Sequence, residues 1–134
     1  MTDVDDELRR AASLLGVALA SEEESTFVRA RAFQLAGTTK SFIWQHADRT
    51  LTENLGHDPD SWRRLASMLA GRPNILFTEE GSTVWKLRDG EQLESFIGEM
   101  FGFEFYVLDL SSGGALYCLN HHDGLIRYNG GVTS

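Results

Sequence analysis

The sequence is poor in cysteine, in proline and in long apolar stretches. Its 134 residues include one cysteine, Cys118, and two prolines. A single cysteine excludes an internal disulfide and any zinc site built from several cysteines. The most apolar segment, residues 14–20, is far shorter than the roughly 20 residues that span a bilayer. The N-terminus is acidic where a secretory signal would be basic. We therefore expect a cytoplasmic protein with no membrane segment.

Positive charge is also scarce. Lys and Arg number 12 against 20 Asp and Glu, which gives a formal net charge of −8. This balance opposes nucleic-acid binding, because affinity for phosphates comes largely from Lys and Arg. An acidic surface instead favours a basic protein partner and speeds the encounter with it. The same charge also keeps a small protein soluble, so the sequence leaves both interpretations open.

Sequence-local catalytic motifs are missing as well. The chain contains no P-loop, no G-x-G-x-x-G, no H-E-x-x-H and no G-x-S-x-G. We therefore expect no cofactor and lean towards a noncatalytic protein. The missing motifs do not exclude an enzyme assembled from residues that are distant in sequence.

The length and the 42% hydrophobic content suffice for one core, so we expect a single α+β domain over residues 1–134. Residues 1–72 are predicted to be mostly helical, and residues 73–134 to be rich in strands with one helix. Apolar spacing, together with a capping-box pattern at Ser21 and Glu24, predicts helices at about 4–19, 21–37, 60–71 and 90–102. Residues 40–54 are ambiguous, and the spacing of Trp44, Ala47 and Leu51 favours a helix there.

The strands are predicted from runs of β-branched and aromatic residues bounded by turns. These runs lie at residues 74–78, 83–87, 103–110, 115–120 and 125–128. Short loops join them in two groups, so neighbours in the chain pair antiparallel. We expect an antiparallel sheet of about five strands, formed mainly by the C-terminal half, with the N-terminal helices packed on one face.

The densest polar cluster is Asn120-His121-His122-Asp123, two residues after Cys118. Imidazole and carboxylate groups bind divalent metals, and histidine is a natural general base. Neighbours in a strand point to opposite faces, however, so both imidazoles reach one ion only if the backbone turns there. Asp123-Gly124 supplies such a turn. A metal would still need a further ligand, for which His46, His57 and glutamates are candidates, and a purely structural turn is the alternative.

Cys118 lies in a predicted strand whose neighbours are mostly apolar. A reactive thiolate would need an electropositive neighbour, which the local sequence lacks. We therefore expect Cys118 to act as a small buried hydrophobic residue.

The C-terminal segment resembles a group of small uncharacterised bacterial proteins. In that group a strand of pattern F-Y-[VIL]-x-D precedes an N-H-H-D segment. Here the matching residues are Phe105 to Asp109 and Asn120 to Asp123, and the similarity extends over about the last 70 residues, a domain-scale stretch. Such chains are similar to immunity or accessory proteins encoded beside polymorphic toxins. The resemblance implies no catalytic residues.

Three functions follow as expectations. The first is a noncatalytic protein-binding module, such as a bacterial immunity protein that neutralises a basic partner, with Asn120, His121, His122 and Asp123 as candidate binding residues. The second is a small metal-binding domain or enzyme that uses His121, His122 and Asp123. The third is a structural domain that self-associates through an exposed strand at the edge of its sheet.

Overall fold

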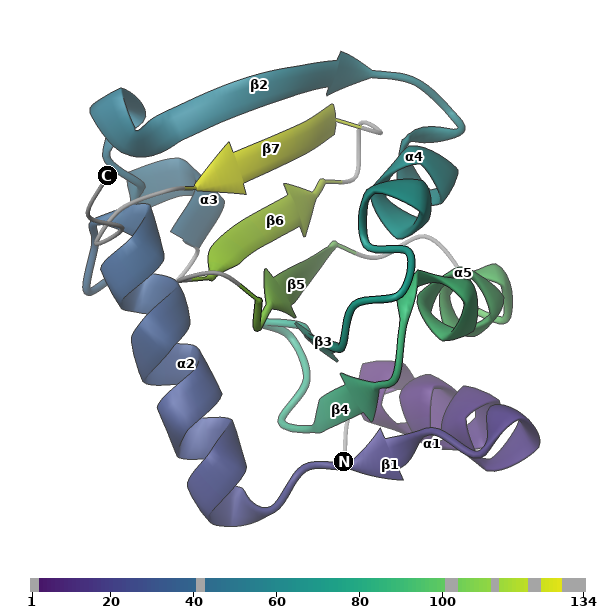
Figure 1. The fold of residues 1–134 in the computed structure, drawn as a ribbon. Coiled ribbons are helices and arrows are strands. Elements are labelled where there is room, and N and C mark those ends of the chain that lie inside the picture. The colour runs from purple at the N-terminus through teal and green to yellow at the C-terminus, as the bar shows by residue number, and fades with distance from the viewer. Residues whose placement is uncertain (1–2, 41–42, 101–103, 112–113, 121–123, 129–134) are drawn as a thin grey trace.

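A computed structural model describes residues 3–40, 43–100, 104–111, 114–120 and 124–128 (Figure 1). The helices are α1 Asp3–Leu15, α2 Glu22–Ala36, α3 Ile43–His46, α4 Ser61–Met68 and α5 Gly90–Gly98, with a 3-10 turn, η1, at Arg49–Leu51. The strands are β1 Ala18–Leu19, β2 Thr52–His57, β3 Asn74–Phe77, β4 Val84–Leu87, β5 Phe105–Asp109, β6 Ala115–Leu119 and β7 Gly124–Tyr128. In this part of the chain no helix has the length and apolar character needed to cross a membrane.

The strands form one antiparallel sheet in the order β1-β4-β3-β5-β6-β7-β2. The α+β class and the five C-terminal strands are confirmed. The prediction of about five strands is wrong in number, because the sheet has seven. Both additional strands come from the N-terminal half and occupy the two edges, so residues 1–72 are less purely helical than predicted.

Neither edge strand has the pattern that usually reveals a strand in a sequence. β1 is two residues long and follows Gly16, whose positive φ of 67° ends α1. A left-handed φ favours glycine and is a common helix stop. The predicted helix at 4–19 is therefore too long by about one turn. β2 has no strict alternation of buried and exposed side chains, and Gly56 within it adopts a φ of 107°.

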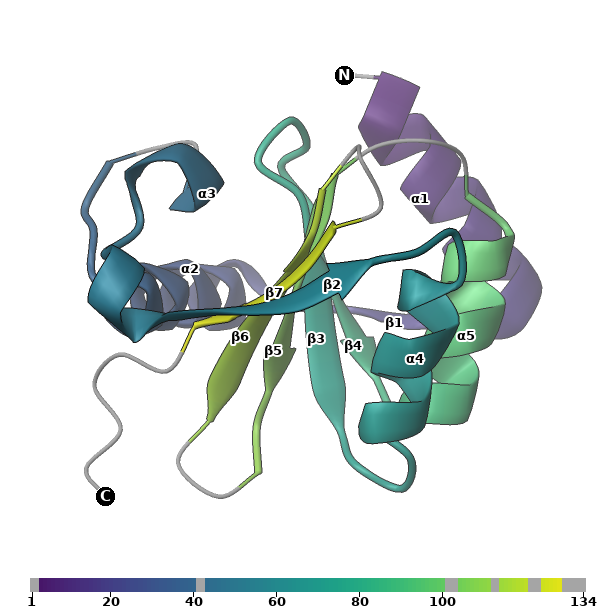
Figure 2. The same cartoon turned by 90° about the horizontal axis from the view of Figure 1, so that it is seen from above.

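Helices cover both faces of the sheet, which corrects the expectation that they pack on one face only. Figure 2 shows α2 and α3 on one side of the sheet and α1, α4 and α5 on the other. Each side has its own apolar core. One core includes Leu8, Leu65 and Phe96 from the helices, and the other includes Val28, Leu35 and Ile43. The central strands β3 and β5 are buried along their whole length, as expected for strands covered twice.

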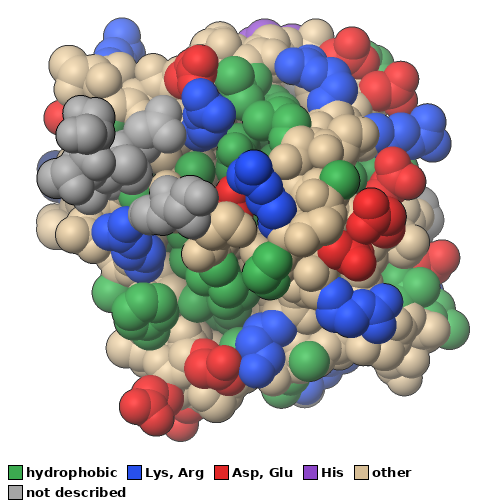
Figure 3. All heavy atoms as spheres, in the orientation of Figure 1, with side chains coloured by type: hydrophobic (Ala, Val, Ile, Leu, Met, Phe, Trp, Pro, Cys, Tyr) green, Lys and Arg blue, Asp and Glu red, His purple; other side chains and the backbone are tan. Residues whose placement is uncertain are grey.

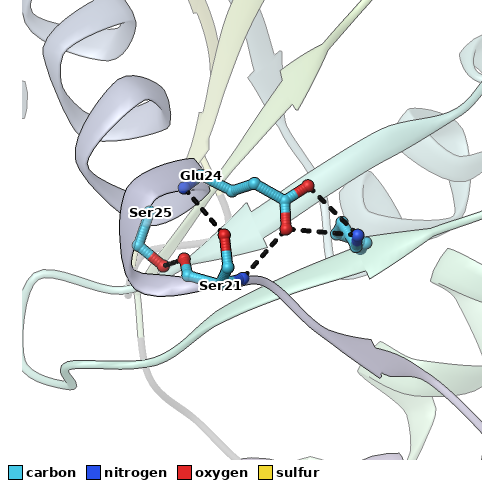
Figure 4. A network of polar contacts seen from close by, with 4 residues as sticks. Ser21, Glu24 and Ser25 are labelled. Atoms are coloured by element: carbon cyan, nitrogen blue, oxygen red, sulfur yellow. Dashed lines mark hydrogen bonds and ion pairs between the residues drawn. The ribbon is translucent and has the colours of Figure 1, made fainter.

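The capping box predicted at the start of α2 is confirmed (Figure 4). Oγ of Ser21 accepts a hydrogen bond from the Glu24 amide at 3.0 Å, and the Glu24 carboxylate accepts one from the Ser21 amide at 2.9 Å. The same carboxylate pairs with Nζ of Lys86 on β4. Hydrogen bonds from Ser21 and Lys86 lower the pKa of Glu24. The capping box begins α2, and the Glu24 carboxylate also links this helix to β4 of the sheet.

The prediction for residues 40–54 is wrong for most of the segment. Among its described residues, 40 and 43–54, only α3 and the η1 turn are helical, and residues from Thr52 onwards belong to β2. The Asp48 side chain caps η1 by accepting a hydrogen bond from the Thr50 amide at 2.9 Å. After α2 the chain has to reach the far edge of the sheet, where β2 pairs with β7. This strand pairing outweighs the helical preference that the apolar spacing of the segment indicates.

Helices α4 and α5 approach each other closely at Gly90. A Cβ atom placed on Gly90 would lie 2.0 Å from the carbonyl oxygen of Ala66 and 2.9 Å from the amide nitrogen of Ala70. Glycine is therefore required where the backbone of one helix meets the backbone of the other. The helix predicted at 90–102 ends earlier than expected, at Gly98, and residues 101–103 lie outside the described part.

Candidate functional site

Asn120 lies at the end of β6 and is the one member of the predicted polar cluster that the structure describes. The backbone amide of Asn120 donates a hydrogen bond to the carbonyl of Gly124 at 3.0 Å, and the side-chain Oδ1 of Asn120 accepts one from the Gly124 backbone amide at 3.0 Å. His121, His122 and Asp123 lie outside the described residues. The strands on either side, β6 and β7, pair antiparallel as predicted.

His57 from the edge strand β2 lies beside the same turn. A Cβ atom on Gly124 would be 2.9 Å from Cε1 of His57 and 2.8 Å from Nδ2 of Asn120. Both side chains therefore lie close to the Gly124 backbone, and a side chain at this position would require them to shift. In the sequence, His57 was a candidate metal ligand only because it is a histidine. In the structure, β2 places its side chain beside Gly124.

Two glutamates lie at the same end of the sheet. Glu104 precedes β5, which pairs with β6 next to Asn120. Glu79 follows β3, and its Oε1 accepts hydrogen bonds from the Ile43 amide at 2.9 Å and the Tyr106 hydroxyl at 2.7 Å. The Tyr106 hydroxyl accepts a further hydrogen bond from the Trp44 amide at 3.2 Å. Glu79 and Tyr106 thus cap the first amides of α3.

No group of three or more His, Cys, Asp and Glu side chains within the described ranges is placed to hold a metal ion. Because His121, His122 and Asp123 lie outside those ranges, the metal-binding or catalytic interpretation of the cluster stays a prediction. Cys118 is fully buried, as predicted, and burial raises the pKa of its thiol. A buried neutral thiol is a poor nucleophile.

The other candidate site is a groove between α1 and α5, which pack side by side and antiparallel. At one end is a hollow of about 600 Å³, lined by Asp6, Glu7, Arg10, Gly98 and Glu99. At the other end is a hollow of about 260 Å³, lined by Leu15, Arg88, Asp89, Glu91, Gln92 and Ser95. We call this surface, with the neighbouring Leu14, the acidic groove.

The acidic groove contains more negative than positive side chains, although Arg10 lines one end and Arg88 lines the other. Arg10 donates to the carbonyl of Glu99 at 2.8 Å and lies 3.9 Å from its carboxylate. Among the described residues, no basic side chain pairs with Asp6, Glu7 or Glu91. Figure 3 shows acidic and basic side chains side by side on the face that carries α4 and α5.

Four carboxylates elsewhere on the described surface have basic partners. Glu24 pairs with Lys86, Asp60 with Arg63 and Asp109 with Arg72, and Glu53 pairs with Arg127. Leu14, which follows Arg10 on the outer side of α1, is 64% exposed. The acidic groove therefore combines free carboxylates with an accessible apolar side chain.

The outer edge of β2 is partly blocked. An Nη atom of Arg64 donates to the carbonyl of Leu55 at 2.6 Å, and Oδ1 of Asn54 accepts the amide of Gly56 at 2.8 Å. An irregularity in the register with β7 separates Asn54 from His57. Side-chain contacts and bulges of this kind discourage pairing with another strand. A second copy of the chain would have to displace both contacts in order to extend the sheet there.

Neither a known protein family, nor a curated protein, nor a solved structure matches this chain. The geometry of this chain alone therefore supports the candidate sites. The acidic groove was missed in the sequence because it joins residues of α1 to residues of α5 that are about 80 positions away. The only sequence signal was the excess of acidic residues.

Proposed function

We propose that this chain is a noncatalytic protein-binding module that neutralises a basic protein partner, in the manner of a cytoplasmic bacterial immunity protein. The observation that supports this proposal best is a set of carboxylates in the acidic groove, Asp6, Glu7 and Glu91, that form no ion pair within the described part of the chain. The chain as a whole carries a net charge of −8.

The proposed physics has two parts. The negative field steers a basic partner to the surface and raises the association rate. A few apolar contacts then supply most of the binding free energy. Leu14, exposed beside the groove, is such an apolar contact. Steering alone predicts binding that weakens strongly with added salt, because the Debye length is only about 8 Å at physiological ionic strength.

The test is co-expression of this chain with each product of the genes adjacent to its own. We expect a stoichiometric complex with a product of basic isoelectric point, and protection of cells from that product if it is toxic. The measurements are co-purification, calorimetry at low and high salt, and cell survival. If none of the basic products binds or is neutralised, the proposal is wrong.

The position of His57 favours a second candidate function, divalent metal binding. Its imidazole lies over Gly124 beside Asn120, and Gly124 directly follows the His121-His122-Asp123 segment. Histidine and aspartate together are a common ligand set for zinc. In this second function, His57 would be the further ligand that a metal bound by His121, His122 and Asp123 needs.

Thermal unfolding with zinc, manganese or nickel tests this second candidate, because a ligand of the native state raises its stability. We expect a rise in Tm for the natural chain and none for His57→Ala or His122→Ala. His46→Ala, an exposed histidine on α3, is the control. Equal shifts in all four proteins, or no shift in any, would remove the metal site.

A further inference from the structure

Helix α3 depends on its surroundings more than the longer helices do. It has four residues, and isolated helices shorter than about 12 residues are marginal in water. Its internal backbone hydrogen bond runs from the Ala47 amide to the Ile43 carbonyl at 2.8 Å. The stability of α3 therefore comes from the side chains that it contacts.

Two side chains of the central strands hold the start of α3. Oε1 of Glu79 accepts a hydrogen bond from the Ile43 amide at 2.9 Å, and the Tyr106 hydroxyl accepts one from the Trp44 amide at 3.2 Å. The Tyr106 hydroxyl also donates to the same Glu79 oxygen at 2.7 Å. Glu79 directly follows the residue after β3, and Tyr106 lies in β5. We call this pair of side chains the clasp, because together they fasten α3 to the sheet.

The chain before and after α3 is fixed by separate contacts. The Asp48 amide donates to the carbonyl of Ala36, the last residue of α2, at 2.9 Å. Gly37 adopts a left-handed φ of 70°, and a Cβ atom there would lie 2.8 Å from Cδ1 of Leu51 and 2.9 Å from Cβ of Asp48. The chain thus leaves α2 at Gly37 and returns to the same point at Asp48. A movement of α3 therefore leaves both α2 and β2 in place.

The core beneath α3 contains polar atoms as well as apolar ones. Ile43 is 1% exposed and belongs to the same apolar core as Tyr106, Cys118 and Tyr128. Cys118 lies directly opposite Tyr106 in the pairing of β5 with β6. The Tyr128 hydroxyl is buried and has no hydrogen-bond partner among the described residues. Burial of such a hydroxyl is unfavourable, and contact with water removes the penalty.

We propose that α3 is a lid on this core, which opens while the sheet and the other helices stay folded. Local openings of this kind require less free energy than global unfolding. In the closed state the clasp holds the lid, and Ile43 fills the core beneath it. In the open state the thiol of Cys118, fully buried when the lid is closed, becomes accessible to disulfides. The lid therefore controls when the single cysteine of the chain can react.

Reaction of Cys118 with a chromogenic aromatic disulfide measures the opening, because the chain has no other thiol. The Cys118 thiolate attacks the reagent, forms a mixed disulfide with one half and releases the other half as a coloured thiolate. At constant pH and low reagent concentration, the rate follows the population of the open state. The clasp variants are Glu79→Ala and Tyr106→Phe. Glu80→Ala, which changes the exposed neighbour of Glu79, is the matched control.

We expect both clasp variants to react on the order of tenfold faster than the natural chain, because each loses hydrogen bonds of the closed state. Glu80→Ala should stay within about twofold, as is usual for a surface substitution. Tyr128→Phe should react more slowly than the natural chain, since it removes the buried hydroxyl that opening would hydrate. Equal rates in the clasp variants and in Glu80→Ala would overturn the lid.

A second comparison separates opening of the lid from unfolding of the whole chain. Gly90→Ala disturbs the contact between α4 and α5, which lie on the other side of the sheet from α3 (Figure 2), so its reaction rate should equal that of the natural chain. The rate should also be nearly independent of urea at low concentration, because a local opening exposes little surface. A rate that rises with the full urea slope of global unfolding would overturn the lid, as would an equal acceleration in Gly90→Ala and the clasp variants. The urea series decides by itself if Gly90→Ala fails to fold.

Discussion

Asp5 in α1 and Thr83 before β4 are 78 residues apart in sequence and are joined by two hydrogen bonds. Oδ1 of Asp5 accepts the Thr83 hydroxyl at 3.0 Å and the Thr83 amide at 3.3 Å. The same carboxylate accepts the amide and the hydroxyl of Ser82. The Thr83 hydroxyl in turn accepts a hydrogen bond from Nε1 of Trp85. A buried acid at the start of α1 therefore fixes this helix to the β3–β4 hairpin.

Replacement of Asp5 by Asn should destabilise the protein by about 1.5–3 kcal/mol, because several hydrogen bonds to a charged acceptor are lost. The measurement is the free energy of unfolding in urea. Asp6→Asn is the matched control, since Asp6 is the exposed neighbour and surface substitutions usually stay within about 0.5 kcal/mol. Equal stabilities of the two variants would contradict this role of Asp5.

The Asp5 contribution should also depend on pH. Burial acts to raise the pKa of Asp5, but hydrogen bonds from Ser82 and Thr83 outweigh it and lower the pKa below its ordinary value. A carboxyl whose pKa is lower in the folded state stabilises the fold above its unfolded pKa of about 3.9. The stabilisation is then lost as pH falls through the folded-state pKa. The stability difference between the natural chain and Asp5→Asn should therefore be constant at neutral pH and shrink in strong acid, as measured by urea unfolding at several pH values.

Tyr106 and Tyr128 give a matched pair of substitutions. The Tyr106 hydroxyl donates to Glu79 and accepts from the Trp44 amide, so Tyr106→Phe should cost about 1–3 kcal/mol. The Tyr128 hydroxyl is buried and has no hydrogen-bond partner among the residues described. Tyr128→Phe should therefore change stability by less than about 0.5 kcal/mol or increase it. Urea unfolding of both variants checks the pair, and a larger loss in Tyr128→Phe would show that its hydroxyl does find a partner.

Gly90→Ala should destabilise the protein by about 3 kcal/mol or more, because the added methyl group would force α4 and α5 apart. The control is Gly98→Ala in the same helix, where the nearest atom to an added Cβ is 3.9 Å away on Trp62. Alanine is the better helix former there by up to about 1 kcal/mol. Thermal unfolding should therefore move in opposite directions for the two variants. A mild effect at Gly90 would mean that the helices can separate.

Arg64→Ala should make the chain more prone to associate through β2, because it frees the carbonyl of Leu55 at the edge of the sheet. Sedimentation velocity at rising concentration measures this. Arg63→Ala is the control, since Arg63 lies over the ring of Trp62 and pairs with Asp60. If both variants associate to the same extent as the natural chain, Arg64 does not protect the edge.

The sequence was most informative where the structure is most regular. The strands at 74–77, 84–87, 105–109, 115–119 and 124–128 were all predicted, because each is a compact run of strand formers between turns. The long helices were predicted, but their distribution over both faces of the sheet was not, although the uninterrupted apolar runs Ile75-Leu76-Phe77 and Phe105 to Leu108 are typical of strands buried on both sides.

The edge strands and the acidic groove could not be predicted in the same way. Ala18-Leu19 is too short for any pattern, and β2 contains Glu53, Asn54 and Gly56, which are poor strand formers. The groove exists only because α1 packs against α5, a contact that local periodicity does not encode. Asn120 was predicted as the last residue of a strand and directly follows β6, which ends at Leu119, whereas the placement of His57 beside it depends on β2.

The two strands at the borders of the sheet have consequences for the order of folding. Both are made early in synthesis, yet β1 pairs with β4 and β2 pairs with β7, the last of the described strands. By contrast, β3–β4, β5–β6 and β6–β7 join neighbours in sequence, and such local pairings form fastest. A nascent chain therefore holds β1 without its partner until β4 has been made, and β2 without its partner until β7 has been made. The N-terminal half thus closes around a C-terminal nucleus.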